Sequence, residues 1–411
     1  MQKTLDAKLA DIHANADSKA FILADAKDAD MAFGMAAPGA EQEARGGQFR
    51  SLQDYRDHIR QNVQQGLLDI MLMSVSTSEV LTIQERVFDD SPVTPAVRAN
   101  DTTDIHTPRG GSYVRTPSRP FSTAVIDHAQ AGRILTDDGG DRRRGADLGL
   151  YSVTFNNDVE LDRATLEAYR DFRVEAERKG FRHFLEVFAP NAPVNPVPAE
   201  KMGHFLNDLI ARTLAGVAQA GRPIFLKMVY TGPGAMEEIT RYDPHLVPGI
   251  LGGSAGTTYD AFKLLDEARQ HGAKAALFGR KINNSEHQLT FIHFLRMVAD
   301  GQLGPEDAVR AYHGVLEQLN IRPRRTLAQD MRLTDPALSY VKPAGATRAS
   351  VSLMGTGYAA GQGRSAPRPG AAPAEKSSRD WPVRADGSPD FASMTPQQRL
   401  AYHTQRLKHL G

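Results

Sequence analysis

The chain of 411 residues contains no cysteine. This absence excludes disulfide bonds, a thiolate nucleophile, and zinc or iron–sulfur sites with cysteine ligands. The sequence also lacks an excess of charge of either sign, because 49 Lys and Arg residues balance 49 Asp and Glu residues. No overall field therefore recruits nucleic acid or an anionic membrane surface, and a small molecule is the expected partner.

Long apolar runs are missing as well. The sequence has no uninterrupted stretch of about 18 apolar residues, the length needed to span a bilayer. Its first residues, MQKTLDAKLADIHANADSK, alternate in charge and lack the apolar core of a secretory signal. These features predict an unprocessed cytoplasmic protein with no membrane partner.

Short apolar runs alternate with longer segments of helical period between residue 20 and about residue 320. The eight runs are FILAD (21–25), LLDIMLM (67–73), TPAVRAN (94–100), LGLYSVTF (148–155), FRHFLEVF (181–188), IFLKMVY (224–230), VPGILGG (247–253) and AALFGR (275–280). Several are almost entirely apolar, as is typical of strands covered on both faces. Eight units favour an α/β fold of the (β/α)8 TIM-barrel kind, with an open doubly wound sheet as the alternative. Residues 101–147 interrupt the alternation as a long excursion between the third and fourth strands.

The alternating pattern fades after Leu319. Residues 341–390 are rich in Ala, Gly, Pro, Ser and Arg and have too few large apolar side chains for a core. We expect three parts: a barrel over residues 1–330, a flexible Ala/Gly/Pro-rich tail over residues 331–390, and a C-terminal helix over residues 391–411. Thr395 is suited to cap that helix, because Pro396 follows at its first position. The terminal helix favours a homo-oligomer.

Lys227 is the outstanding candidate for chemistry. It lies inside an apolar run, and side chains at the carboxyl ends of barrel strands point into one shared mouth. An inward-facing lysine is desolvated there, which lowers its pKa and provides the neutral amine that a Schiff base requires. Alternatively, Lys227 points outward between helices, or it pairs with Glu186 on the preceding strand.

The ends of the last two strands predict a phosphate site. GGSAGT (252–257) follows the seventh run and opens a helix, so that backbone amides can converge on an anion. Arg280, at the end of the eighth run, offers a fork of donors, and phosphate bound by these two loops recurs in this fold. The predicted site comprises Gly252, Gly253, Ser254, Gly279 and Arg280. The alternatives are a helix-capping glycine turn and a surface arginine.

These segments resemble the class I, lysine-dependent aldolases, the family of archaeal- and bacterial-type fructose-bisphosphate aldolase, deoxyribose-phosphate aldolase and the related thiolase of autoinducer breakdown. LKMVYTGPGAMEEI is similar to the family's sixth-strand segment, with Lys227 at the Schiff-base position. PGILGGSAGTTYDAFKLLDEARQHGAKAALFGRKI is similar to its Gly-Gly, helix, strand, Gly-Arg-Asn phosphate region, although Lys281 replaces the Asn. The resemblance is strong over roughly residues 181–300.

The resemblance also implies residues for proton transfer. FLEVFAPN is similar to the family's Val-Glu-x-x-Pro segment and places Glu186 beside the lysine. GLYSV resembles Gly-Tyr-Thr-Ile-Tyr, which points to Tyr151 as an acid or base. The third group is Asp28, which would share with the other two the proton transfers at the hydroxyl and the enamine.

The first strand fits the family only in part. The family has Ala-x-Asp-His-Gly followed by a glycine six residues past the Asp, and Asp28 with Gly34 matches that spacing. Ala29 and Asp30 stand where the His and Gly are usual, and Asp25 competes for the role of Asp28.

We therefore expect an aldehyde-lyase of carbohydrate metabolism that acts on a phosphorylated sugar or keto-sugar through a Lys227 Schiff base and uses no cofactor. An acyl transferase on the same lysine barrel is one alternative, and a catalytically silent barrel that acts as a scaffold is another. His106 and His128 raise the possibility of a metal-dependent aldolase, but no third spaced ligand accompanies them, so no metal is expected.

Overall fold

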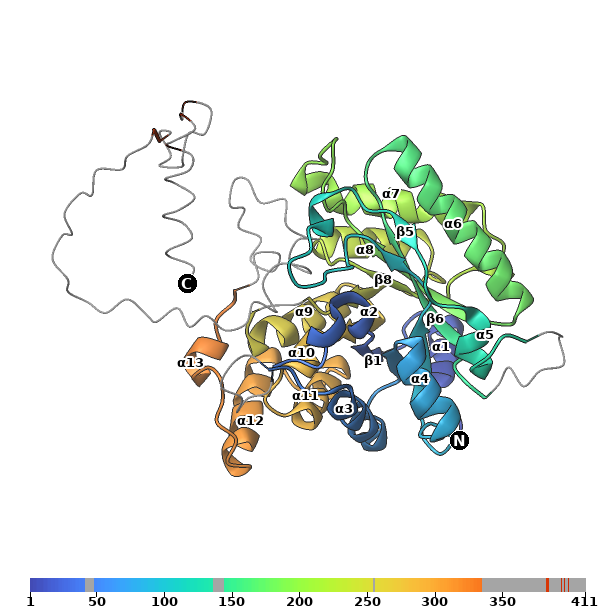
Figure 1. Cartoon of the computed structure of the whole chain (residues 1–411). Coiled ribbons are helices and arrows are strands. Elements are labelled where there is room, and N and C mark those ends of the chain that lie inside the picture. The colour runs from blue at the N-terminus through green and yellow to red at the C-terminus, as the bar shows by residue number, and fades with distance from the viewer. Residues whose placement is uncertain are drawn as a thin grey trace. The chain divides into compact units, whose positions relative to one another are not determined.

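The computed structural model describes residues 1–40, 48–135, 144–253 and 256–334, together with residues 382, 383, 393, 395 and 398. The chain divides into two units, Met1–Gly361 and Gln362–Gly411. The first unit contains a closed barrel of parallel strands (Figure 1).

The barrel closes in the strand order β1-β10-β9-β8-β7-β6-β3-β2. Its strands are β1 Ile22–Lys27, β2 Ile70–Met73, β3 Thr94–Arg98, β6 Leu148–Thr154, β7 Arg182–Phe188, β8 Leu226–Met228, β9 Gly249–Leu251 and β10 Ala275–Phe278. Each strand overlaps one of the eight apolar runs. The predicted (β/α)8 barrel is thus confirmed, and the open doubly wound sheet is excluded.

Helices surround the barrel strands (Figure 1). The longer ones are α1 Thr4–Ala14, α3 Leu52–Gln65, α6 Val159–Arg178, α7 Met202–Ala215, α8 Pro233–Tyr242, α9 Thr258–Gln270, α11 Gln288–Ala299 and α12 Pro305–Gln318. Short helices are α2 Asp30–Phe33, α4 Val75–Ser78, α5 Ile126–Ala131, α10 Arg280–Asn283 and α13 Leu327–Asp330, and a π-helical turn, η2, spans Glu79–Gln84. Single 3₁₀ turns are η1 Gly34–Ala36, η3 Tyr113–Arg115, η4 Ala199–Lys201 and η5 Gln219–Gly221. Within the described ranges, no helix combines the length and the apolarity that a bilayer crossing requires.

Polar N-caps fix where several of these helices begin. Ser51 accepts from the N–H of Asp54, whose carboxylate accepts from the N–H of Ser51 in return. Thr257 and Asp260 make the same reciprocal pair at the start of α9. Such capping boxes satisfy backbone donors that the helix itself leaves unpaired, and the second one ends the loop that follows β9.

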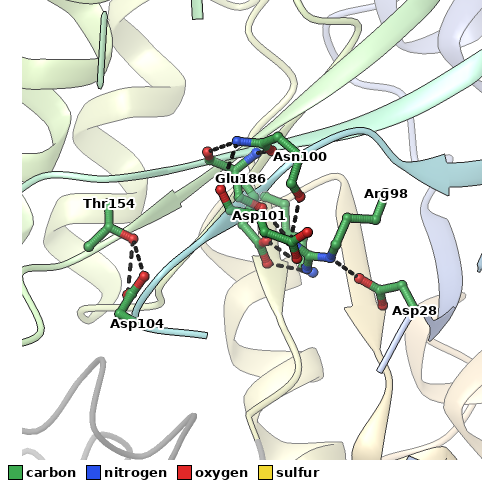
Figure 2. A network of polar contacts seen from close by, with 9 residues as sticks. Asp28, Arg98, Asn100, Asp101, Asp104, Thr154 and Glu186 are labelled. Carbon is green, nitrogen blue, oxygen red and sulfur yellow. Dashed lines mark hydrogen bonds and ion pairs between the residues drawn. The ribbon is translucent and has the colours of Figure 1, made fainter. Parts of the chain in front are cut away.

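The excursion between the third and fourth barrel strands has structure of its own. It carries a two-stranded antiparallel sheet of β4 Asp101–Thr102 and β5 Pro120–Phe121. The Asp104 carboxylate accepts a hydrogen bond from the hydroxyl of Thr154, the last residue of β6, at 3.1 Å (Figure 2). It also accepts from the hydroxyl of Ser118 at 2.7 Å. These bonds tie the excursion to the carboxyl ends of the barrel strands.

Apolar side chains fill the interior of the barrel. Leu148 and Leu150 of β6 face Phe184 of β7 and Phe225, and the two phenylalanine rings stack at a centroid distance of 4.5 Å. All four side chains are buried. We call these four side chains the apolar plug. Because side chains alternate faces along a strand, the residues two positions after Leu150, Phe184 and Phe225 also point into the barrel, one layer above the plug.

We expect Phe225→Ala to lower the free energy of unfolding by about 3–5 kcal/mol, because it removes half of the stacked pair from a packed interior. Urea denaturation followed by circular dichroism measures this change. Val159→Ala serves as the control, since Val159 is 80% exposed and its loss should change stability by about 0.5 kcal/mol or less. A Phe225→Ala protein as stable as the control would contradict the packing described here.

Few residues of the second unit are described. The hydroxyl of Thr395 accepts from the N–H of Gln398 at 3.3 Å, and the Gln398 side chain accepts from the N–H of Thr395 at 3.0 Å. These reciprocal bonds form a capping box at the residue predicted to cap the terminal helix. Nearly all of the predicted tail and of the helix over residues 391–411 lies outside the described residues, so those boundaries stay predictions.

Candidate active site

Three adjacent strands place polar side chains in one row above the apolar plug. Ser152 of β6 is in register with Glu186 of β7, and Glu186 is in register with Lys227 of β8. Nζ of Lys227 lies 2.6 Å from Oε1 of Glu186, and the Ser152 hydroxyl donates to Oε2 of Glu186 at 2.5 Å. Lys227 therefore faces the barrel interior and does not point outward between helices. The other alternative, a pair with Glu186, is found in the structure and lies inside the barrel.

Arg98, the last residue of β3, joins this row to β1 (Figure 2). Its Nε donates to Oδ2 of Asp28 at 2.5 Å, its Nη1 donates to the Ser152 hydroxyl oxygen at 2.9 Å, and its Nη2 lies 3.4 Å from Oε2 of Glu186. The side chains of this group are no more than 8% exposed. Four buried charges of alternating sign result, and we name them the charge chain: Asp28, Arg98, Glu186 and Lys227.

The charge chain decides the protonation state of Asp28. Burial alone would raise the pKa of this carboxyl, but the positive charges of Arg98 and, less strongly, Lys227 outweigh burial and hold the pKa below its ordinary value. Asp28 is therefore a carboxylate at neutral pH, able to accept a proton.

A cavity opens at the carboxyl ends of the strands, and the whole charge chain lines it. Its other walls are mostly apolar: Ile105, Phe188 and Leu251 contribute to one small hydrophobic cluster that borders the cavity. Ile105 and Thr107 come from the excursion, so this segment forms part of the cavity wall. The excursion thus covers one side of the cavity.

The loops after β9 and β10 form another part of the cavity wall, and β10 is the direct neighbour of β1, the strand that Asp28 follows. Gly252, Gly253, Gly279 and Arg280 all line the same cavity as Lys227. Gly253 has a φ of +62°, which suits glycine, and an added Cβ at Gly279 would lie 2.6 Å from the carbonyl oxygen of Ala26. The structure thus brings four of the five predicted phosphate-binding residues together with the lysine, while Ser254 lies outside the described residues.

The start of α9 differs from the sequence-based expectation. The N–H of Thr258 donates to Oδ1 of Asp330 at 2.8 Å, and the N–H of Thr257 donates to Oδ2 of Asp260 at 2.7 Å. Carboxylates of the protein therefore already occupy these two amides. These two amides are therefore not free to bind a substrate anion, contrary to the expectation for the opening of this helix. The glycine loops and Arg280 remain as candidates for anion binding.

Arg280 is held close to the mouth by an aromatic ring. Its guanidinium carbon lies 5.6 Å from the centroid of Phe33, in a cation–π arrangement, and both residues line the cavity. The predicted alternative of a plain surface arginine does not describe this position.

Tyr151 does not join the group. Its ring stacks on Phe172 of α6 at a centroid distance of 4.5 Å and lies beside Tyr169, in the layer between barrel and helices. Burial in this layer also raises its pKa. The physical reason is alternation along β6, because Ser152, one residue further on, takes the inward face. We correct the expectation for Tyr151 accordingly.

Two residues of the site were missed in the sequence. Arg98 stands inside the apolar run TPAVRAN much as Lys227 stands inside its own run, and this isolated charge was the available signal. Ser152 continues the inward alternation of Leu148 and Leu150, but that face of β6 could be chosen only with the register known.

Asp25 lies on the other face of β1. It is fully buried, accepts a hydrogen bond from Asn62 at 2.8 Å, and lies 3.7 Å from Nζ of Lys27. Asp25 does not line the cavity, whereas Asp28 does. Its position in the cavity wall thus keeps Asp28, and not Asp25, as the candidate for proton transfer.

The two candidate metal ligands lie in the excursion. The ring of His106 contacts Tyr113 and Phe121, and His128 lies in α5. In the part of the chain that the structure describes, no three or more side chains of the metal-ligating kind are grouped to hold an ion.

The fold is thus a closed (β/α)8 barrel, and Lys227 faces its interior. No family model matches the chain, and no curated protein matches it. Solved structures do.

Three such structures are fructose-bisphosphate aldolases. An archaeal enzyme matches with 12% identity and a TM-score of 0.50, over 72% of this chain and 99% of its own. A second archaeal structure, with its catalytic lysine covalently bound to the carbinolamine intermediate of the substrate, matches with 13% identity and a TM-score of 0.51, over 72% and 100%. The enzyme of Slackia heliotrinireducens matches with 14% identity and a TM-score of 0.52, over 75% and 91%. At such identities the likeness establishes the shared barrel fold.

Asp30, which stands at a position where the resembled family has glycine, carries a pH-dependent cost. It accepts a hydrogen bond from the Ser74 hydroxyl at 2.5 Å, while its Oδ1 is buried and has no hydrogen-bond partner among the described residues. Burial raises its pKa from 3.8 to about 6, helped by the negative charge of Asp28. The folded protein thus binds a proton on Asp30 more tightly than the unfolded chain does. Asp30 therefore lowers the free energy of unfolding as the pH rises from 3.8 to about 6.

We therefore expect Asp30→Asn to be more stable than the wild type at pH 8, by about 2 kcal/mol. The gain should shrink as the pH falls from 6 toward 3.8, because the wild-type carboxyl is then protonated as well. Urea denaturation of both proteins at pH 4, 6 and 8 measures the difference. A constant difference at all three values would contradict the assignment.

Proposed function

We propose that this protein is a class I aldolase, an aldehyde-lyase that cleaves or forms a carbon–carbon bond in a phosphorylated sugar or keto-sugar through a Schiff base on Lys227. The observation that carries the proposal is the amine of Lys227, which lines a cavity while in contact with a proton acceptor, Oε1 of Glu186, at 2.6 Å. The structural neighbours include an aldolase described as forming a Schiff base, which supports the same reaction class.

The first half of the reaction forms the imine. The Lys227 amine, after giving a proton to Glu186, adds to the carbonyl carbon of the substrate, and the carbinolamine then loses water to become an iminium ion. Glu186 is placed to return its proton to the departing hydroxyl group. The apolar wall around the lysine keeps bulk water from this carbon.

The second half breaks the carbon–carbon bond. Asp28, ionised because of its charged neighbours, accepts the proton of the hydroxyl β to the iminium carbon. The bond then breaks, its electron pair moves to the iminium nitrogen, and an aldehyde and an enamine result. Asp28 then gives the proton it took to the enamine carbon, and hydrolysis of the iminium by one water molecule releases the ketone and restores the amine.

The phosphate group of the substrate would lie against the loops after β9 and β10. Gly252, Gly253 and Gly279 keep the backbone of this wall accessible, and Arg280 supplies positive charge at the same end of the cavity. Lys227 lines the same cavity, so one ligand can reach the lysine and this wall together.

Borohydride reduction in the presence of dihydroxyacetone phosphate tests the imine. We expect the intact mass of the wild type to increase by one reduced adduct, and peptide mapping to locate the adduct on Lys227. Lys227→Met should form no adduct and lose turnover while keeping its circular dichroism spectrum. Lys263→Met, a change on α9 at a lysine that pairs with Glu267, is the matched control and should react as the wild type does.

Several outcomes would reject the proposal. An adduct on another lysine would remove Lys227 from the chemistry, and a folded Lys227→Met protein with full biological activity would favour the scaffold alternative. With fructose 1,6-bisphosphate, a keto-sugar that has a hydroxyl β to its carbonyl, imine formation without release of an aldehyde in product analysis by NMR would instead favour acyl transfer.

We expect Arg280→Gln to weaken the binding of dihydroxyacetone phosphate about tenfold or more, because a charged hydrogen bond to the phosphate is lost. Binding is measured as the concentration that gives half-maximal borohydride trapping. Dihydroxyacetone, which has no phosphate, should be trapped equally well by variant and wild type. Arg310→Gln, on the exposed face of α12, is the control, and an equal effect on both ligands would contradict the phosphate assignment.

A further inference from the structure

Arg98 lines the cavity, but neither the pattern of apolar runs nor the resemblance to aldolases gave it a role in the site. Every part of its guanidinium group is engaged: Nε with Asp28, Nη1 with Ser152, and Nη2 with Glu186 (Figure 2). These partners come from three different strands or strand ends of the barrel. A guanidinium fork has the planar geometry to hold several acceptors at fixed angles, which an ammonium group lacks.

The neighbours of Arg98 are clamped in turn. Asn100 accepts from the N–H of Ser152 at 2.6 Å and donates to the carbonyl oxygen of Ser152 at 2.8 Å. The Ser152 hydroxyl is thereby held where it accepts from Arg98 and donates to Oε2 of Glu186. Oε1 of the same carboxylate remains directed at Lys227. The orientation of Glu186 is thus determined by contacts that lead back to Arg98.

Asp28 has many like charges around it and few positive ones. Carboxylates from three further positions interact with it unfavourably: Asp25 of β1, Asp30 of α2 and Asp101 of β4. The positive groups that act on it are Arg98 and Lys227, with Arg98 the stronger. The charged groups that act on Arg98 itself are Asp28, Glu186 and Asp101. The charge of Arg98 is therefore what offsets the crowding of carboxylates at the end of β1.

We propose that Arg98 is a positioning residue of this site, which holds Asp28 and Glu186 in fixed places on either side of it, so that the substrate on Lys227 meets two carboxyl groups of set geometry. The inference rests on the proposed function. Arg98 acts through the two carboxylates, and the proton is taken from the substrate by a carboxylate and not by Arg98. Preorganised groups of this kind lower the barrier because they need not reorient as the proton moves.

Another arginine provides a matched control for a purely structural role. Arg296 of α11 is also buried, and it donates to Asp69 at 3.2 Å and to Asp300 at 3.0 Å. It does not line the cavity. Substitutions of Arg98 and Arg296 therefore both disrupt a buried arginine with two carboxylate partners, but only those of Arg98 should alter the reaction.

The decisive measurement is the exchange of the carbon-bound α-proton of dihydroxyacetone phosphate for solvent deuterium, followed by NMR across pH. On the imine, a carboxylate removes this proton to give the enamine, and solvent deuterium returns. Arg98→Lys keeps the charge but loses the fork, so we expect exchange at the optimum to fall about tenfold or more. Arg98→Gln also loses the charge, so the acid limb of the profile should move up by about one pH unit or more. Arg296→Lys and Arg296→Gln should lower the melting temperature and leave the profile of the wild type in place.

Two results would overturn the role of Arg98. One is a wild-type exchange rate and profile in a folded Arg98→Lys protein, which is the variant to rely on if Arg98→Gln does not fold. The other is an equal change of profile in the Arg296 variants, which would reduce both arginines to a structural function.

A second measurement separates this inference from the proposed function. In wild-type protein labelled with ¹³C at the aspartate carboxyl carbons, the signal of Asp28 is assigned by its loss in Asp28→Asn, and its titration is followed across pH. We expect a midpoint below the ordinary value of 3.8 in the wild type and a higher one in Arg98→Gln. If the wild type forms no imine, the aldolase proposal fails. The titration still tests the role of Arg98, since a wild-type midpoint above 3.8 would show that Arg98 does not lower the pKa of Asp28.

Discussion

The burial of four charges inside one apolar barrel is the constraint on which the rest of the site depends. A lone lysine in such an interior would be very costly, because charge leaves water without compensation. In this barrel each member of the charge chain lies next to a group of opposite charge, and its two negative and two positive charges add up to zero. The same pairing that makes burial tolerable also fixes the distances between the groups that would exchange protons with a substrate.

The barrel supplies the frame for this arrangement. The stacked rings of Phe184 and Phe225 close the interior from below, so the next inward layer is the first place where a substrate could meet a side chain. Neighbouring strands in register then align Ser152, Glu186 and Lys227 across that layer. The glycine loops and the excursion complete the walls, and together they define a cavity with a charged side and an apolar side.

Much of this could be predicted from the sequence, and the remainder could not for definite reasons. The strands were readable because each is an apolar run between helical segments, and Lys227 stood out as a charge inside such a run. Glu186 and Asp28 were implied by the resemblance to the class I aldolases. Tyr151 was assigned to the wrong face because a shift of one residue along a strand exchanges inside for outside. The isolated charge of Arg98 could be seen in the sequence, but its partners could not, since they come from strands far apart in the sequence that meet only once the barrel closes.

The bond between Asp330 and the amide of Thr258 links the last described helix, α13, to the loop that carries Gly252 and Gly253. Thr334 adds a second link, because its backbone N–H donates to Asp260 at 2.7 Å. Residues 326–334 thus act as a brace on the first turn of α9, which follows the glycine loop, and none of these described residues lines the cavity. A chain shortened before this brace would keep every residue of the charge chain and yet leave the wall facing the substrate without its anchor.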